Sequence, residues 1–196
     1  HSMIATPRPK LLDLFCGAGG AAMGYHRAGF DVWGIDDQPQ RHYPFKFIQG
    51  DWADFVELAR DFDVIHASPP CQRYTCLKSV VDSSKYGDYI ADVRALYGQL
   101  GKPMIIENVV GAPLRRDLIL CAAPFGLRSY RHRIFECNFP VVQPPHPKHV
   151  VRVNRKKERR KAHWDEGGFV SVVGDIGRYV GPEAMGIDWM TGAELS

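Results

Sequence analysis

Apolar and polar positions alternate along this chain in a way that predicts strands and helices in turn. Short apolar runs typical of buried strands occur at 11–15, 31–36, 45–49, 62–67, 103–106, 118–120, 133–137 and 169–173. Amphipathic segments typical of helices occur at 20–28, 52–60 and 88–100. This alternation predicts an α/β fold with a doubly wound, mostly parallel, Rossmann-like sheet.

A glycine-rich turn comes after the first predicted strand. Asp13-Leu14-Phe15 leads through Cys16-Gly17-Ala18-Gly19-Gly20 into the first predicted helix. Strand, glycine turn and helix form the opening unit of a nucleotide-binding sheet. The missing side chains let a ligand approach the backbone closely. A tight turn without a ligand has the same composition, so the later elements of the chain decide between the two interpretations.

Acidic residues stand at the ends of later predicted strands. Asp36 ends the second strand, and an acid about 20 residues beyond the glycine turn hydrogen-bonds ribose hydroxyls in dinucleotide-type folds. Asp51 comes after the third strand, where it could accept from an adenine amino group or cap the helix at 52–60. The sequence leaves both roles of Asp51 open.

Two prolines and a cysteine come after the fourth predicted strand. Most free cysteines are small buried hydrophobic residues. Cys71, however, stands directly after Pro69-Pro70 at the edge where ligands bind in open α/β sheets. The next segment, 73–87, is polar and typical of a loop that closes over a site. Glu107 then places another acid at the end of the fifth strand.

Composition limits the partners. The 196 residues suit one domain with a small irregular appendage, and the net charge of +3 does not by itself indicate nucleic acid. The segment 152–161, however, holds seven basic residues and one acid, which predicts a phosphate-binding patch unless it is only a solvated face. No apolar run or leader suggests a membrane, and the five cysteines suit a reducing cytoplasm.

A zinc site is a second interpretation of the region after the sheet. Cys137, His146, His149 and His163 lie close to one another in the chain. Only His146 and His149 have the spacing of a tight ligand pair. The sequence therefore predicts no metal site.

Six elements occur in the order found in the cytosine-C5 DNA methyltransferases, and the chain resembles that family over about 11–139. They are Asp13–Gly20, Asp36, Asp51, Pro69-Pro70-Cys71-Gln72, Glu107-Asn108-Val109 and Arg131-His132-Arg133. The resemblance implies the fold of S-adenosylmethionine-dependent methyltransferases and transfer of a methyl group to C5 of a cytosine flipped out of double-stranded DNA. S-adenosyl-L-homocysteine would be the product of the cofactor.

The resemblance also implies a role for each matching residue. The catalytic residues would be Cys71, Glu107, Arg131 and Arg133. The cofactor would contact Phe15, Cys16, Gly17, Ala18, Gly19, Gly20, Asp36, Asp37, Asp51, Trp52 and Pro70. The nucleic acid would contact Gln72, Arg73, Arg155, Lys156, Lys157, Arg159 and Arg160.

The expected chemistry explains these residue types. A thiolate from Cys71 that adds to C6 of the base makes C5 nucleophilic, and a protonated Glu107 supports this step at N3. The base must first leave the duplex, because the helix hides C6. The arginine pair would position the ring carbonyl and a phosphate.

The expected organisation has three parts: a catalytic domain at 4–139, a small basic target-recognition region at 140–180, and a return segment at 181–196 that stops short of the family's closing segment. Asp36 and Ser129 stand where the family more often has Glu and Gln. A monomeric, cytoplasmic, nucleoid-associated enzyme of prokaryotic or phage origin is expected. The alternatives are a transfer-RNA methyltransferase and a nucleic-acid-binding relative with little activity.

Overall fold

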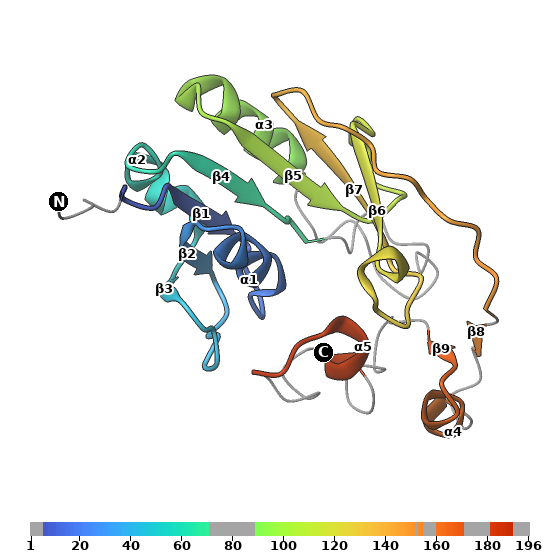
Figure 1. Ribbon diagram of the computed structural model, residues 1–196. Helices are drawn as coiled ribbons and strands as arrows, with labels where there is room; N and C mark the ends of the chain where they lie inside the picture. Colours follow the sequence, from blue (N-terminus) through green and yellow to red (C-terminus); the bar gives the residue numbers. More distant parts are fainter. Residues whose placement is uncertain (1–5, 71–88, 152, 155–159, 171–180, 190–196) are drawn as a thin grey trace, which may run out of the picture.

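A seven-stranded sheet organises the chain in the computed structural model, which describes residues 6–70, 89–151, 153–154, 160–170 and 181–189 (Figure 1). The strand order is β3-β2-β1-β4-β5-β7-β6. The strands are β1 (Lys10–Leu14), β2 (Asp31–Asp36), β3 (Lys46–Gln49), β4 (Val64–Ala67), β5 (Met104–Asn108), β6 (Leu118–Cys121) and β7 (His132–Cys137).

The sheet is mostly parallel, as the sequence predicts. Strands β1 to β5 pair in parallel, whereas β7 runs antiparallel to both β5 and β6. From β1 the chain builds outward to β2 and β3, and it then returns to place β4 and β5 on the other side. Ligands bind where the order of an open sheet reverses in this way, beyond the carboxyl ends of the strands. That position lies here between β1 and β4.

Helices cover both faces of the sheet. On one face, Leu12 and Leu14 of β1 belong to the same buried cluster as Ile90 and Val93 of α3 (Tyr89–Leu100), and α2 (Val56–Ala59) adds to it. On the other face, Leu11 packs in a cluster with residues of α1 (Gly20–Arg27). Successive residues of a strand point to opposite faces, so both faces of β1 are buried. The doubly wound prediction is confirmed.

The sequence placed most elements within a few residues of their observed bounds. The predicted helix at 52–60 begins as a 3₁₀ helix, η1 (Trp52–Phe55), and continues as α2. The fifth strand extends to Asn108, two residues beyond the prediction. The extension is a result of pairing, because Glu107 and Asn108 lie opposite Phe135 and Ile134 of β7. Glu107 is therefore held by the sheet itself.

A smaller unit comes after the sheet in the chain. It contains β8 (Val153–Asn154), α4 (Arg160–Asp165), β9 (Phe169–Val170) and α5 (Gly181–Met185). Strand β9 joins the rest of the protein through a parallel bridge from Val170 to Ser129, and the Val170 N–H donates to the Arg128 carbonyl at 3.0 Å. None of the helices in the described ranges has the length and apolar character needed to cross a membrane.

A buried carboxylate ties α3 to β7. Glu136 accepts two hydrogen bonds from Arg94, at 2.9 and 2.7 Å, and a third from the Arg115 backbone N–H at 2.8 Å. Burial alone would raise the pKa of Glu136, but the hydrogen bonds and charges of the two arginines outweigh burial and lower the pKa. Ionised Glu136 therefore stabilises the fold.

Replacing Glu136 by alanine is expected to lower the free energy of unfolding by about 2–3 kcal/mol near neutral pH, because hydrogen bonds to a charged group are lost. Because the folded pKa is lowered, this stabilisation is present above the unfolded pKa of about 4.3 and disappears as pH falls through the folded value. Urea unfolding at several pH values measures both effects. The matched control is Glu57→Ala, which removes an exposed ion pair with Arg60 and should change little. An equal loss in the two variants would contradict the prediction.

Candidate active site

A pocket lies at the carboxyl ends of the strands near the reversal of strand order. Six residues that the sequence assigned to a cofactor line it: Phe15, Asp36, Asp37, Asp51, Trp52 and Pro70. Ile35, Gly50 and Tyr89 complete the lining. Acidic and aromatic side chains, brought together from five separate segments, therefore face one space.

Asp36 holds the glycine turn at the edge of this pocket. One carboxylate oxygen accepts from the Gly17 backbone N–H at 2.8 Å, and the other accepts from the Gln38 N–H at 3.0 Å. A carboxylate offers about four acceptor positions, so Asp36 can also accept from ligand hydroxyls. The shorter arm of aspartate thus reaches both the turn and the pocket.

Phe15 has a strained backbone at the end of β1. Its φ is 57°, the only positive φ of a non-glycine residue in the described chain. Such conformations are costly and cluster at functional sites. The ring of Phe15 lies 5.9 Å from that of Trp52 and 5.7 Å from that of Tyr89. The strain therefore accompanies an aromatic wall of the pocket.

Asp51 performs the capping role that the sequence left open. Its side chain accepts from the Ala53 backbone N–H at 3.0 Å and so caps η1. The same residue also lines the pocket. The cap is confirmed, and contact with an adenine amino group stays a prediction.

The glycine turn itself is less directly involved in the pocket than predicted. None of Cys16, Gly17, Ala18, Gly19 and Gly20 is among the described residues that line it. Cys16 is buried in the cluster under α1, where burial strongly raises the pKa of its thiol. Its side chain is a packing group, so only its backbone could meet a ligand. The turn is braced from a distant part of the chain, since Trp189 Nε1 donates to the Ala18 carbonyl at 2.8 Å.

Replacing Asp36 by alanine is expected to weaken binding of S-adenosylmethionine, the cofactor that the resemblance implies, by about 10- to 100-fold, because the variant loses a charged acceptor and the bond that holds Gly17. Isothermal titration calorimetry measures this change directly. Asp54→Asn is the matched control, because Asp54 is an exposed acid beside the pocket that does not line it. Unchanged affinity in Asp36→Ala would remove Asp36 from the binding site.

Glu107 and Arg133 form an ion pair at the end of β5. The Nε of Arg133 lies 2.6 Å from Oε1 of Glu107, and both side chains are about four-fifths buried, with 22% and 19% exposed. Burial raises the pKa of Glu107, while Arg133 and Arg131 oppose that rise. The sheet accounts for the pairing, because β7 lies beside β5 and begins between the two arginines. The structure thus brings three of the four predicted catalytic residues together.

The backbone that precedes Cys71 is fixed by neighbouring strands. The buried side chain of Asn108 donates to the Pro69 carbonyl at 2.9 Å and accepts from its neighbour, the Val109 N–H, at 2.9 Å. The Ser68 hydroxyl donates to the Phe15 carbonyl at 3.0 Å. This end of β4 is therefore held between the pocket and Glu107. Cys71, Gln72 and Arg73 themselves lie outside the described residues.

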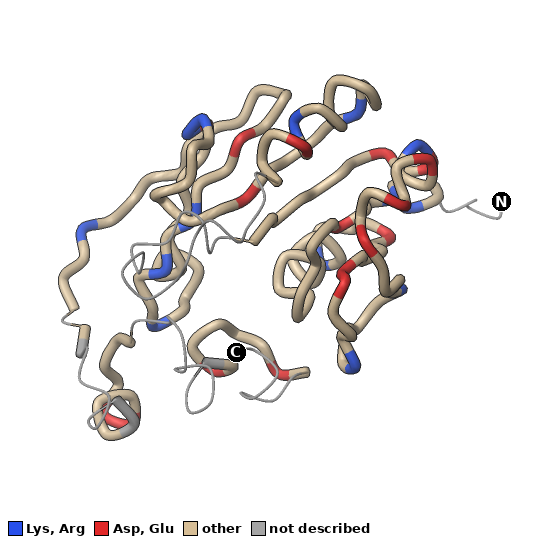
Figure 2. The backbone as a smooth tube through the Cα atoms, turned by 180° about the vertical axis from the view of Figure 1, so that it is seen from behind, with Lys and Arg blue, Asp and Glu red and all other residues tan. Residues whose placement is uncertain are grey.

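Most of the predicted nucleic-acid contacts also lie outside the described residues, namely Arg155, Lys156, Lys157 and Arg159. Of Arg160 the structure describes only its place as the first residue of α4. Basic residues nevertheless predominate in the second half of the described sheet: 89–151 holds eight basic and four acidic residues, whereas 6–70 holds six basic and nine acidic (Figure 2). The charge changes sign across the sheet.

Ser129 is a packing residue. Its side chain is buried, and its backbone bridges to Val170 of β9. The position where the family more often has glutamine therefore contributes here to the junction with the smaller unit.

The sequence alone did not single out Tyr89, Ser68 or Trp189, and it gave Asn108 no role beyond its place in Glu107-Asn108-Val109. Tyr89 stands at the start of the helix that follows the long polar segment. That position was the one feature of the sequence that could have pointed to Tyr89 as a residue of the pocket. The hydrogen bonds of Ser68 and Asn108 depend on how the strands pair. Trp189 donates its hydrogen bond to a residue near the other end of the described chain.

The four residues that the sequence offered as zinc ligands do not form one group. His146 and His149 lie beside Cys121 and His132, and these four are the only described residues that could share a metal ion. Cys137 is at the opposite end of β7 from His132, roughly 17 Å away at the rise of an extended strand. His163 belongs to α4.

The fold and the pocket define an α/β protein built to bind a nucleotide-like cofactor. The family model for C-5 cytosine-specific DNA methylases matches residues 9–111, and the chain belongs to this family. Family membership supports S-adenosylmethionine as the cofactor, as the sequence predicted.

Two curated relatives agree with this family. The chain is 24% identical over 188 residues to the type II methyltransferase M.AgeI of Thalassovita gelatinovora, covering 72% of this chain and 42% of the relative. It is 31% identical over 124 residues to M.XorII of Xanthomonas oryzae pv. oryzae, covering 53% and 29%. The chain thus spans less than half the length of these relatives. A solved S-adenosylmethionine-dependent methyltransferase from Agrobacterium tumefaciens aligns with a TM-score of 0.39 and 15% identity, over 56% of this chain and 42% of that one.

Proposed function

We propose that this protein methylates C5 of cytosine in double-stranded DNA, on a base flipped out of the helix and held covalently through C6 to Cys71. The observation that carries the proposal is the ion pair between Glu107 and Arg133 at 2.6 Å, next to the fixed end of β4. Asn108, adjacent to Glu107 in β5, bonds to Pro69, and Pro70 lines the pocket. A methyl donor and an acid that contacts the base can therefore act from neighbouring places.

The residues of the pocket fit the cofactor. Asp36 would accept from the ribose hydroxyls, and Phe15 and Trp52 would pack beside the adenine. Asp37 and Asp51 add negative charge that suits a sulfonium ion. When bound, the cofactor supplies an electrophilic methyl group.

The chain's own side chains would activate the base. The Cys71 thiolate attacks C6 and forms a carbon–sulfur bond, while a proton passes from the Glu107 carboxyl to N3 of the ring. Burial raises the pKa of Glu107 and so favours the protonated form that this step needs, while Arg133 and Arg131 oppose the rise. Arg133 holds the carboxyl in place for this step, and Arg131 adds positive charge beside it. After C5 is methylated, a water molecule takes the C5 proton and the carbon–sulfur bond breaks to release the thiolate. N3 returns its proton to Glu107, and the neutral aromatic ring is restored.

The recognition of DNA would use the basic half of the protein. The charge excess over 89–151 and the basic segment 152–161 lie beyond the acidic cofactor half in the chain. Lysine and arginine that neutralise phosphates supply most of the affinity for a duplex of any sequence.

Methyl transfer to unmethylated phage genomic DNA tests the proposal, because such DNA contains every short target sequence. The protein is incubated with methyl-labelled S-adenosylmethionine, and the digested nucleosides are separated by mass spectrometry. We expect label in 5-methyldeoxycytidine. A parallel reaction uses unmodified transfer RNA.

Each other outcome would contradict the proposal in a distinct way. Label in 5-methylcytidine of transfer RNA alone would make the protein an RNA methyltransferase. Label in a different deoxynucleoside would exclude the chemistry assigned to Cys71. DNA and cofactor binding without any label would indicate a nucleic-acid-binding relative that does not catalyse.

A further inference from the structure

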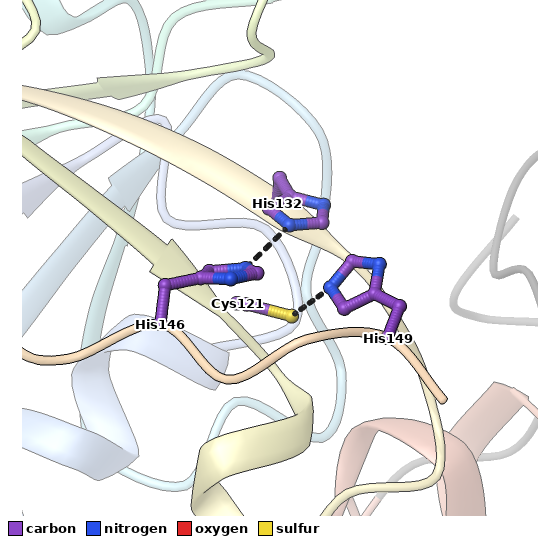
Figure 3. A group of neighbouring side chains, drawn as sticks. All are labelled: Cys121, His132, His146 and His149. Carbon is purple, nitrogen blue, oxygen red and sulfur yellow. Dashed lines mark hydrogen bonds between the residues drawn. The ribbon is translucent and has the colours of Figure 1, made fainter. Parts of the chain in front are cut away.

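Four side chains with metal-binding atoms meet at one end of the β6–β7 pair, apart from the cofactor pocket. They are Cys121, His132, His146 and His149, and their ligand atoms all lie within 4.8 Å of one another. Figure 3 shows the four side chains directed toward a common point. Cys121 is buried, whereas His146 and His149 come from the irregular segment that passes over the strands.

Pairing of the two strands accounts for half of the group. Cys121 at the end of β6 lies directly opposite His132 at the start of β7 in the antiparallel register. Side chains at such positions have Cβ atoms about 4.5–5.5 Å apart. His146 and His149 are separated by two residues, which lets both reach one point. The arrangement thus combines two ligands from a rigid sheet with a closely spaced pair from a loop.

The distances between ligand atoms are near those of a tetrahedral zinc site, one matching and the other about 0.3 Å shorter than expected. Bond lengths of about 2.3 Å to sulfur and about 2.0–2.1 Å to nitrogen place the ligand atoms of a tetrahedral zinc site roughly 3.3–3.6 Å apart. The Sγ of Cys121 lies 3.6 Å from Nε2 of His149, and Nε2 of His132 lies 3.0 Å from Nε2 of His146. Hydrogen bonds join Cys121 to His149 and His132 to His146, and one ion could replace both by binding all four atoms.

The geometry points to a structural zinc site in which Cys121, His132, His146 and His149 are the four ligands. One thiolate and three imidazoles suit a borderline-soft ion, and four protein ligands close the coordination shell without leaving a position for substrate. The site is thus structural, and the ion takes no part in the methyl-transfer reaction.

Neighbouring residues already orient the ligands. The ring of Tyr130 stacks on His149 with centroids 3.8 Å apart and an angle of 11° between the planes. The Tyr130 hydroxyl accepts from the Val151 N–H at 3.0 Å. The stacked ring of Tyr130 therefore restricts the orientation of the His149 ring.

Zinc at this position would connect two parts of the molecule. His132 lies between Arg131 and Arg133 in the chain, and the Arg133 Nη1 donates to the His132 carbonyl at 2.8 Å. His146 and His149 lie on the segment that leads toward β8 and the basic region. The ion would therefore fix the approach to the recognition region against β7, which begins between the two arginines predicted to be catalytic.

Metal content tests this proposal independently of methyl transfer. The protein is purified without metal-affinity chromatography and measured by inductively coupled plasma mass spectrometry. We expect one equivalent of zinc. Cobalt replacement should give the intense visible bands of a tetrahedral ion and a thiolate-to-cobalt charge-transfer band. Absence of zinc together with absence of these bands would overturn the proposal, and stoichiometric copper or iron would overturn the choice of metal.

Variants on the exposed segment separate metal binding from folding. Changing a residue that only supports a metal ligand typically lowers metal affinity roughly 10- to 100-fold. His146→Ala removes a ligand itself and should lower zinc affinity by more than that. His146→Cys retains a ligand atom and should keep the ion. The controls are Cys137→Ala and His26→Ala, because neither residue belongs to the cluster; both should retain zinc. Loss of zinc in Cys137→Ala but not in His146→Ala would assign the ion to another site and overturn ours.

Trypsin gives a second readout. Lys148 lies in the exposed segment between the two histidines, so a bound ion should protect the bond after Lys148, and chelation should expose it. Equal cleavage with and without chelator would contradict the site.

Discussion

Replacing Cys71 by alanine is expected to reduce methyl transfer to DNA by about 10⁴-fold or more, because the proposed reaction begins with addition of its thiolate to the base. C5 of an unactivated cytosine does not attack a methyl donor. The remaining protein should still bind S-adenosylmethionine, since Asp36, Phe15 and Trp52 of the pocket are unchanged. The rate of label transfer and a calorimetric titration together measure this separation of binding from catalysis.

A duplex that contains 5-fluorocytosine sharpens the test of Cys71. Fluorine replaces the C5 proton whose loss would release the enzyme, so the covalent complex should accumulate and be visible as a mass shift. Cys71→Ala should give no such complex, whereas Cys137→Ala, a change of a buried cysteine in β7, should still form it. An adduct that maps by peptide mass spectrometry to any other cysteine would refute the assignment.

Glu107→Gln is expected to lower kcat by about 10²- to 10⁴-fold, the usual contribution of a positioned general acid. The amide can still accept from Arg133, but it cannot deliver a proton to N3. Because burial raises the pKa of Glu107, its protonated fraction falls as pH rises through that value. The wild-type rate should therefore contain a descending limb with increasing pH that is absent in Glu107→Gln. Single-turnover rates across the pH range measure it.

The control for Glu107→Gln is Glu57→Gln, an exposed carboxylate in α2 that pairs only with Arg60 among the described residues. This variant should keep both the rate and the pH profile. A descending limb that persists in Glu107→Gln would assign the titration to a different group.

The sequence was a better guide to which strand ends lie together than to the contacts between those strand ends. The acid at Asp36, the turn before it and the prolines before Cys71 were all placed correctly at the carboxyl edge, because parallel strands bring their ends to one side. The observed bonds of Asp36 to Gly17 and of Asn108 to Pro69 depend on which strands are neighbours, and that information is not local in the sequence.

The histidine cluster illustrates the same limit in another way. Only the spacing of His146 and His149 could be read from the sequence, and it suggested the wrong partners. Cys121 and His132 become neighbours through an antiparallel register that brings together residues on either side of a ten-residue connection. Conversely, the sequence did not show that the side chain of Cys16 packs in the buried cluster under α1.

The hydrogen bond from Trp189 to Ala18 joins residues 171 positions apart. During synthesis the glycine turn emerges from the ribosome early, yet this brace forms only after the segment that carries Trp189 has emerged as well. Interactions between distant parts of a chain form late and slow its folding. A polypeptide terminated before Trp189 would therefore lack this hydrogen bond and, with it, one support of the glycine turn.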